Sequence, residues 1–92
     1  MQLTRDYFTS RGFETNHPDY VLCKMYKHNT EGNEWRIMVE EEYIPLTNKL
    51  AYNINAWRCA ETGAIIKRAS VHMAEDSNEL DTIIKLCGIK EN

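Results

Sequence analysis

The sequence predicts a single α+β domain spanning residues 1–92, in which one short helix at each end brackets a four-stranded antiparallel sheet. Three observations predict this fold. Helix start and stop signals lie near both ends of the chain, alternating apolar and polar residues fill the middle, and turn residues separate the alternating segments. The expected order is α-β-β-β-β-α, with both helices on one face of the sheet.

Composition and charge place the chain among ordinary globular domains. It has 92 residues, of which 42% are hydrophobic and 27% charged, and a net charge of −3. The weak acidity argues against broad binding to nucleic acid or to an anionic membrane, because such binding requires several basic contacts. A local basic patch remains compatible with it.

The pattern of apolar residues predicts a cytoplasmic protein with no membrane segment. No apolar run approaches the roughly 18–20 residues of a transmembrane helix. The opening residues 1–6 lack the apolar core of a signal peptide and include an early acid. The three cysteines, which lack C-x-x-C spacing, are expected to be free thiols in a reducing compartment.

The first helix is predicted at about residues 4–11. Thr4 is a suitable N-cap, and Asp6 lies in the first turn, where the helix dipole favours a negative charge. Gly12 can adopt the left-handed conformation that ends a helix, and Phe13 can pack back against it. A helix of two turns is not stable alone, so it must dock on the sheet.

The first hairpin is predicted from two alternating segments, Tyr20–His28 and Trp35–Glu40. A loop at Thr30-Glu31-Gly32 would pair Met25 with Ile37, Cys23 with Val39, Tyr26 with Arg36 and His28 with Glu34. The run Glu40-Glu41-Glu42 and the following Pro45 break the strand pattern, so they predict a solvated connection or an edge. Because consecutive strand residues point to opposite faces, the three glutamates do not predict a metal site.

The second hairpin is predicted from residues 49–60 and 64–73. A two-residue Thr62-Gly63 turn places Ile54 opposite Val71, together with the pairs Ala56–Ala69 and Tyr52–Met73. A three-residue loop would instead place Ile54 opposite Ser70, so the even-length loop is preferred.

The closing helix has the clearest signals in the chain. Asp76 and Glu79 have capping-box spacing, and Gly88 can end the helix. An apolar stripe at helical spacing runs between them through Leu80, Ile83, Ile84 and Cys87.

No catalytic, metal or cofactor site is predicted. Asn53, Cys59 and His72 share the outer face of the second hairpin, but Asn53 and Cys59 lie six residues apart on one strand. That separation is about 20 Å, too far for a nucleophile and its base. We therefore expect a protein without enzymatic activity.

A basic and aromatic group on the outer sheet face is the candidate binding face, which comprises Lys24, Tyr26, Arg36, Trp57 and Arg68. Arg68 lies opposite Trp57 in the predicted register, as a cation–π pair would require. Such a face either shields the sheet or binds a partner. A protein partner, a second copy or a host protein, is favoured by the acidic net charge. The alternative is weak binding of single-stranded nucleic acid by stacking.

Two resemblances accompany this interpretation. The element order resembles the double-stranded-RNA-binding domain, but the stretch at the start of its closing helix, where that family has lysines, is here Asp76-Ser77-Asn78-Glu79, which would repel phosphate. The opening Leu3–Phe8 with Gly12-Phe13, and the closing Glu79-Leu80 with Leu86–Ile89, resemble small uncharacterised proteins carried by phages and mobile elements of gut bacteria. That resemblance implies a phage-like accessory protein and no particular activity.

Overall fold

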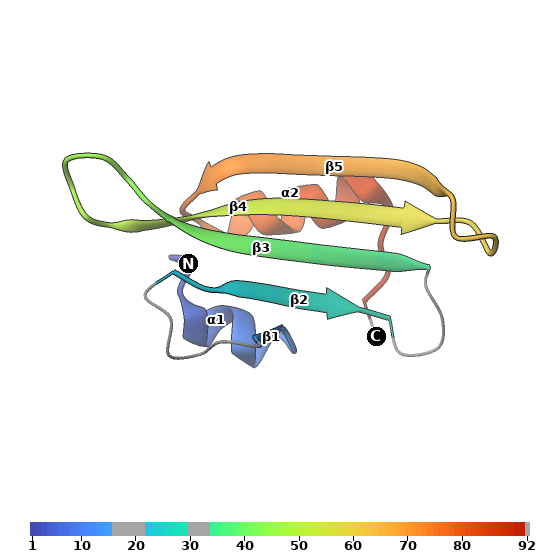
Figure 1. Ribbon diagram of the computed structural model, residues 1–92, viewed down its shortest axis with the longest axis horizontal. Coiled ribbons are helices and arrows are strands. Elements are labelled where there is room, and N and C mark those ends of the chain that lie inside the picture. Colours follow the sequence, from blue (N-terminus) through green and yellow to red (C-terminus); the bar gives the residue numbers. More distant parts are fainter. Residues whose placement is uncertain (16–21, 30–33, 92) are drawn as a thin grey trace.

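A computed structural model describes residues 1–15, 22–29 and 34–91 of the chain. The strands form one antiparallel sheet in the order β1-β2-β3-β4-β5, and Figure 1 looks onto the face of the sheet opposite α2. The elements in chain order are α1 (Arg5–Ser10), β1 (Glu14–Thr15), β2 (Lys24–His28), β3 (Trp35–Tyr43), β4 (Leu50–Cys59), β5 (Ile65–Ala74) and α2 (Ser77–Cys87).

The α+β class is confirmed, but the predicted strand number is wrong, because the described residues already form a sheet of five strands rather than four. The additional strand is β1, in which Glu14 pairs with Tyr26 and Thr15 with Met25. Gly12 turns the chain with a φ of 88°, and the buried Phe13 anchors it beside β2. A strand of two residues is too short to produce an alternating pattern.

The helix caps form as the sequence predicts. The side chain of Thr4 accepts a hydrogen bond from the Tyr7 N–H at 3.0 Å, which begins α1. Asp76 begins α2 through a capping box: its carboxylate accepts from the N–H of Asn78, and Glu79 accepts in return from the N–H of Asp76. Each cap satisfies donors that the first helical turn leaves without an intrahelical partner.

At the end of α2, Gly88 has a φ of 71°, and the Arg58 guanidinium donates to the carbonyl of Cys87 at 3.1 Å. A Cβ at Gly88 would lie 3.3 Å from Arg58 Nε, whereas one at Gly63 (φ 89°) would meet nothing within 4 Å. Gly88→Ala is therefore expected to lower the free energy of unfolding by about 1 kcal/mol or slightly more. Urea denaturation beside Gly63→Ala, which carries only the conformational cost, measures the part due to Arg58. Equal losses in the two variants would contradict this account of the helix end.

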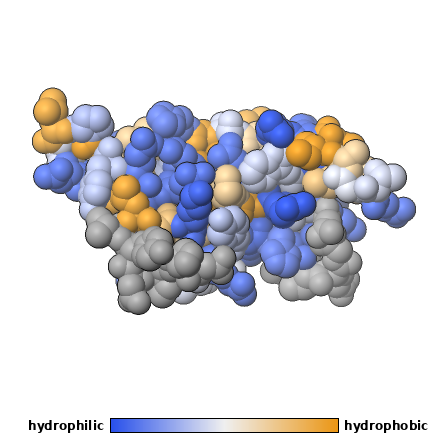
Figure 2. Space-filling model, viewed as in Figure 1, coloured by the Kyte–Doolittle hydropathy of each residue, from blue (hydrophilic) through white to orange (hydrophobic). Residues whose placement is uncertain are grey.

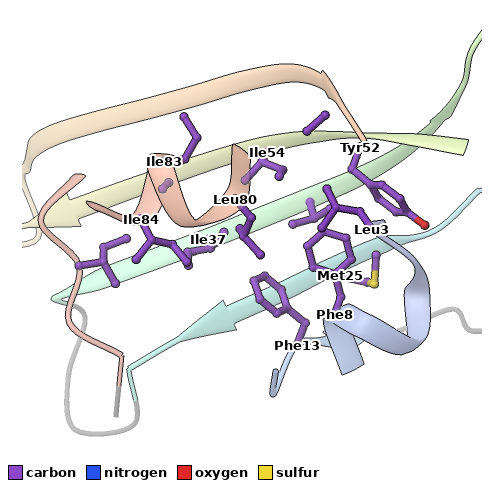
Figure 3. Packing of buried hydrophobic residues seen from close by; sticks show 14 of the residues in the cluster. Leu3, Phe8, Phe13, Met25, Ile37, Tyr52, Ile54, Leu80, Ile83 and Ile84 are labelled. Atoms are coloured by element: carbon purple, nitrogen blue, oxygen red, sulfur yellow. The ribbon is translucent and has the colours of Figure 1, made fainter. Parts of the chain in front are cut away.

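Both helices pack on one face of the sheet, as predicted. A single core cluster contains Phe8 and Phe13 from the α1 region, Leu80 from α2, and Ile37 and Ile54 from the strands. Figure 3 shows these side chains between the sheet and the two helices. Val71 packs against the cluster, and Val21, which belongs to the predicted segment Tyr20–His28, lies outside the described residues. The opposite face of the sheet, named here the outer face, has no helix on it in the part of the chain that the structure describes.

The predicted register of the first hairpin is wrong by two residues. Met25 lies opposite Val39 rather than Ile37, and Tyr26 lies opposite Met38 rather than Arg36. The connection between the strands is longer than three residues, because β2 ends at His28 and β3 begins at Trp35. The side-chain amide oxygen of Asn29 accepts a hydrogen bond from the Trp35 N–H. A shift of two residues keeps every side chain on its predicted face, because the strand period is two. The predicted start at Tyr20 lies outside the described residues, and β2 begins at Lys24.

The acidic run continues β3 rather than ending it. The strand extends through Tyr43 and pairs along its whole length with β4, so the prediction of a solvated connection at residues 40–42 is wrong. Glu40 and Glu42 are partly exposed, but Glu41 points into the core, where its side chain has no exposed surface. The turn comes later, at Pro45, where the Thr47 N–H donates to the Ile44 carbonyl.

The register of the second hairpin is confirmed in its middle, although its predicted loop length is wrong. Ile54 lies opposite Val71, and Ala56 opposite Ala69. The Ala60 N–H donates to the Ala64 carbonyl, which leaves a three-residue loop, and an irregularity between Arg58 and Cys59 then restores the predicted register. A second irregularity places Tyr52 opposite Ala74 instead of Met73.

Candidate functional site

The outer face consists of side chains from β2 to β5 that point away from the helices. Figure 2, which looks onto this face, shows hydrophilic residues over most of it, with separate hydrophobic patches. The cross-strand register arranges these side chains in three rows: His28–Arg36–Trp57–Arg68, Tyr26–Met38–Asn55–Ser70 and Lys24–Glu40–Asn53.

The first row brings three of the five predicted binding residues together. Arg36 lies directly opposite Trp57, and Trp57 directly opposite Arg68. Tyr26 lies in the neighbouring row, opposite Met38. Lys24 lies one row further from Arg36 and opposite Glu40, which offsets its charge. The predicted residues therefore form one tight group of three with Tyr26 at its side, and Lys24 is set apart.

The predicted cation–π pair is present. The Arg68 guanidinium carbon lies 5.9 Å from the centroid of the Trp57 ring, within the range of a favourable cation–π contact. Trp57 is half-buried, while Arg36 and Arg68 are exposed. The row thus presents an indole ring with a guanidinium on each neighbouring strand.

A hollow of about 200 Å³ adjoins this row, lined by Arg36, Trp57, Cys59, Gly63 and Ile65. Cys59 is only 8% exposed, whereas Ile65 is 50% exposed. The hollow combines an aromatic wall, an aliphatic wall and one guanidinium. It is large enough to receive a single side chain rather than a drug-sized ligand.

Two apolar features of the outer face were not among the predicted binding residues. Strand alternation places Met38 on the same face as Arg36, and the structure shows that it lies in the centre of this face, between Tyr26 and Asn55. Ile65 and Ile66 are both about half exposed because the strand irregularity falls between Arg58 and Cys59 of the partner strand. The irregularity could not be predicted from alternating apolar and polar residues, because an irregularity of this kind interrupts the alternation.

A buried charged group lies on the other side of the sheet. The Arg5 guanidinium donates to both carboxylate oxygens of Glu41, at 2.6 to 2.9 Å. The Cys23 N–H and the Tyr52 hydroxyl also donate to this carboxylate, at 2.9 and 3.1 Å. The sequence interpretation missed this group, because its members are distant in the chain.

The titration behaviour of this group follows from its contacts. Burial acts to raise the pKa of Glu41, but the hydrogen bonds from Arg5 and Cys23 outweigh it and hold that pKa below its usual value. Burial, with the Glu41 charge, raises the pKa values of the Tyr52 hydroxyl and the Cys23 thiol. Both groups are thus kept protonated at neutral pH, which suits a structural role rather than nucleophilic chemistry.

The residues considered for catalysis and metal binding either form hydrogen bonds with other groups or lie apart from one another. The side chain of Asn53 accepts from the Met73 N–H and donates to Glu42. His72 is exposed near the end of β5, and His17 lies outside the described residues. Within residues 1–15, 22–29 and 34–91, no three His, Cys, Asp or Glu side chains are grouped so that they could hold a metal ion.

Comparisons with protein-family models, with curated proteins and with solved structures found no match to this chain. None of the helices in the described residues has the length and apolar character needed to cross a membrane.

Proposed function

We propose that this protein is a small, non-enzymatic interaction module that binds a protein partner, either a second copy of itself or a host protein, through the outer face of its sheet. The observation that supports this proposal is the row formed by Arg36, Trp57 and Arg68 on a face that neither helix covers. A phage-like accessory role and a cytoplasmic location belong to the same proposal.

The chemistry of the row suits a protein interface. Trp and Arg are enriched among the residues that contribute most to binding energy between proteins. Trp57 is held in place by its strand and by Arg68, so little conformational entropy is lost when a partner packs on it. The hollow beside it offers a place for one partner side chain, and Met38 and Tyr26 extend the apolar surface.

Replacing Trp57 by Ala, or Arg36 by Glu, is expected to abolish association while the fold remains intact. Both side chains point away from the core, so their loss removes contact surface without opening a cavity. The loss of affinity should be at least 2 kcal/mol, or about thirtyfold, as is typical for a central Trp or Arg. Sedimentation measures self-association, and a pull-down with each variant followed by mass spectrometry measures binding to other proteins.

Lys90→Glu is the matched control, because it makes the same change of charge at an exposed position away from the outer face. This variant should have the same assembly mass in sedimentation, and the same partners in the pull-down, as the natural sequence. If Trp57→Ala and Arg36→Glu also keep the assembly mass and the partners of the natural sequence, the proposal is contradicted. Circular dichroism of all three variants establishes that each one is folded.

The second candidate function is weak binding of single-stranded nucleic acid, which the same row of a ring between two guanidinium groups favours. Two features weigh against it: the net charge is −3, and Arg68 lies over the face of Trp57 on which a base would stack. This function requires an affinity for oligonucleotides that falls steeply with salt and with Trp57→Ala. Fluorescence titration at low salt with no change in Trp emission would remove it.

A further inference from the structure

Strand β5 is an open edge of the sheet. It pairs with β4 on one side, and within the described residues no strand pairs with its other side. The five residues from Lys67 to Val71 are in regular register with β4, and irregularities bound this segment on both sides. All ten residues of β5 are exposed or half-buried except Ala74. An edge of this kind is a template on which another strand can form.

The backbone groups that face the open edge can be identified. The Cys59 N–H donates to the Glu34 carbonyl at 2.7 Å, so this residue of β4 bonds toward β3. The direction of hydrogen bonding alternates along an antiparallel strand, so the backbone of Arg58 bonds toward β5, where its partner is Lys67. Arg68 and Ser70 therefore direct their N–H and C=O groups away from β4, toward the open edge.

A groove accompanies this edge on the helix side of the sheet. It has a volume of about 270 Å³ and is lined by Ser70, Val71, Asn78, Glu79, Thr82 and Ile83. Ser70 belongs to the outer face, so the groove reaches across the edge of the strand. Every second side chain of a strand added beside β5 would point toward α2 and enter this groove, where Val71 and Ile83 offer an apolar surface.

The other side chains of an added strand would lie on the outer-face side of the edge, beside Arg68. β5 carries two basic residues, Lys67 and Arg68, and none of its residues is acidic, although the whole chain carries a net charge of −3. Carboxylates on the added strand would be attracted to these groups. A second copy of β5 would instead place like charges against one another, which disfavours pairing of two copies through this edge.

We propose that the β5 edge binds an extended segment of another protein, in which apolar residues alternate with acidic ones, as a sixth strand of the sheet. The apolar residues enter the groove between β5 and α2, and the acidic residues lie beside Arg68. This site shares Arg68 with the row of Arg36, Trp57 and Arg68, but it is formed by the backbone edge of β5 and the groove beside α2, so it does not depend on the function proposed for that row.

The test uses substitutions at Ser70, whose N–H faces the open edge. Ser70→Pro removes that donor, and proline is tolerated on an edge strand when the lost N–H is not bonded within the sheet. Ser70→Ala is the matched control, because it changes the side chain and keeps the N–H. The probe is a fluorescently labelled peptide of about seven residues in which valine and glutamate alternate, a length that spans the regular segment of β5. A second peptide has lysine in place of glutamate.

Fluorescence anisotropy is expected to show binding of the glutamate peptide to the natural protein and to Ser70→Ala. Binding to Ser70→Pro should be weaker by about tenfold or more, since a main-chain hydrogen bond is lost and the proline ring blocks the edge. The lysine peptide should not bind. His72→Glu should also weaken binding of the glutamate peptide, and this variant keeps the test decisive if Ser70→Pro fails to fold.

Absence of binding by the glutamate peptide, equal binding of the two peptides, or equal affinity in Ser70→Pro and Ser70→Ala would overturn the proposal. A dimer that Ser70→Pro dissociates, and that the glutamate peptide does not displace, would overturn it in favour of a second copy. Loss of peptide binding in Ser70→Pro leaves the outer-face proposal standing, because this variant keeps Arg36 and Trp57, and Trp57→Ala tests that proposal separately.

Discussion

Replacing Arg5 by Met is expected to lower the free energy of unfolding at pH 7 by roughly 3 kcal/mol, the low end for breaking a buried ion pair. The Glu41 side chain has no exposed surface, so without Arg5 its charge remains buried beside neutral donors from Cys23 and Tyr52. The low end applies because the Arg5 side chain is 34% exposed. Chemical denaturation at fixed pH measures the loss.

The pH dependence of this variant should have the opposite sign to that of the natural protein. In the natural protein the pKa of Glu41 is lowered on folding, so its contribution is complete above the unfolded pKa and is lost as the pH falls through the folded one. Without Arg5, burial raises that pKa instead, and stability should increase as the pH is lowered from about 7 to about 5. Denaturation at both pH values tests this directly.

The matched control adds Glu41→Gln to Arg5→Met. The amide oxygen of Gln can still accept from the Cys23 N–H, but the unpaired charge is gone, so the double variant should be more stable at pH 7 than Arg5→Met alone. Its stability should also lose the dependence on pH between about 5 and 7. A single variant that loses less than about 1 kcal/mol, or that shows no such pH dependence, would mean that the Arg5–Glu41 pair does not secure α1.

Replacing Phe8 by Ala is expected to lower the free energy of unfolding by about 3–5 kcal/mol. Phe8 is completely buried, with its ring centroid 5.1 Å from that of Phe13 and 4.9 Å from that of Tyr52. It is the only buried residue of α1, a helix of six residues that cannot be stable without docking. Differential scanning calorimetry measures the loss of stability.

Hydrogen exchange shows where this loss occurs. In Phe8→Ala, faster exchange is expected first in α1 and β1, which Phe8 holds against the sheet, and later in β3 and β4. Thr9→Ala, at an exposed position of the same helix, should change the stability by no more than about 0.5 kcal/mol. Uniform acceleration throughout the sheet, or a similar loss in both variants, would contradict the docking role of Phe8.

The parts of the fold that the sequence predicted are those in which the signal is local. The caps at Thr4 and Asp76 and the left-handed Gly88 depend on residues a few positions apart. The middle of the second hairpin could be predicted because only one register keeps Ile54 and Val71 together.

The parts that could not be predicted depend on contacts between distant residues. Three consecutive glutamates suggest a solvated segment, and only the placement of Arg5 on α1 makes a buried Glu41 favourable. The shifted register of the first hairpin could not be chosen from the alternating pattern, because both registers keep the same residues on the same faces.

The candidate site was predicted in composition better than in arrangement. Alternation places all five residues on the outer face, and the pairing of Trp57 with Arg68 follows from the correct register of the second hairpin. The pairing of β3 with β4, which sets Arg36 beside Trp57, could not be read from the sequence, since it involves two separate hairpins. The same pairing leaves Lys24 apart from the row.

Photocrosslinking from the outer face tests the central claim, that this face contacts a protein partner, most directly. A photoreactive benzoylphenylalanine replaces Met38 in the centre of the outer face or, as a control, Leu86 on the exposed side of α2. In the cells that make the protein, position 38 should yield a discrete crosslinked product, which mass spectrometry identifies as a second copy or another protein. Position 86 should yield none. The absence of a product from position 38, or the same products from both positions, would contradict the claim.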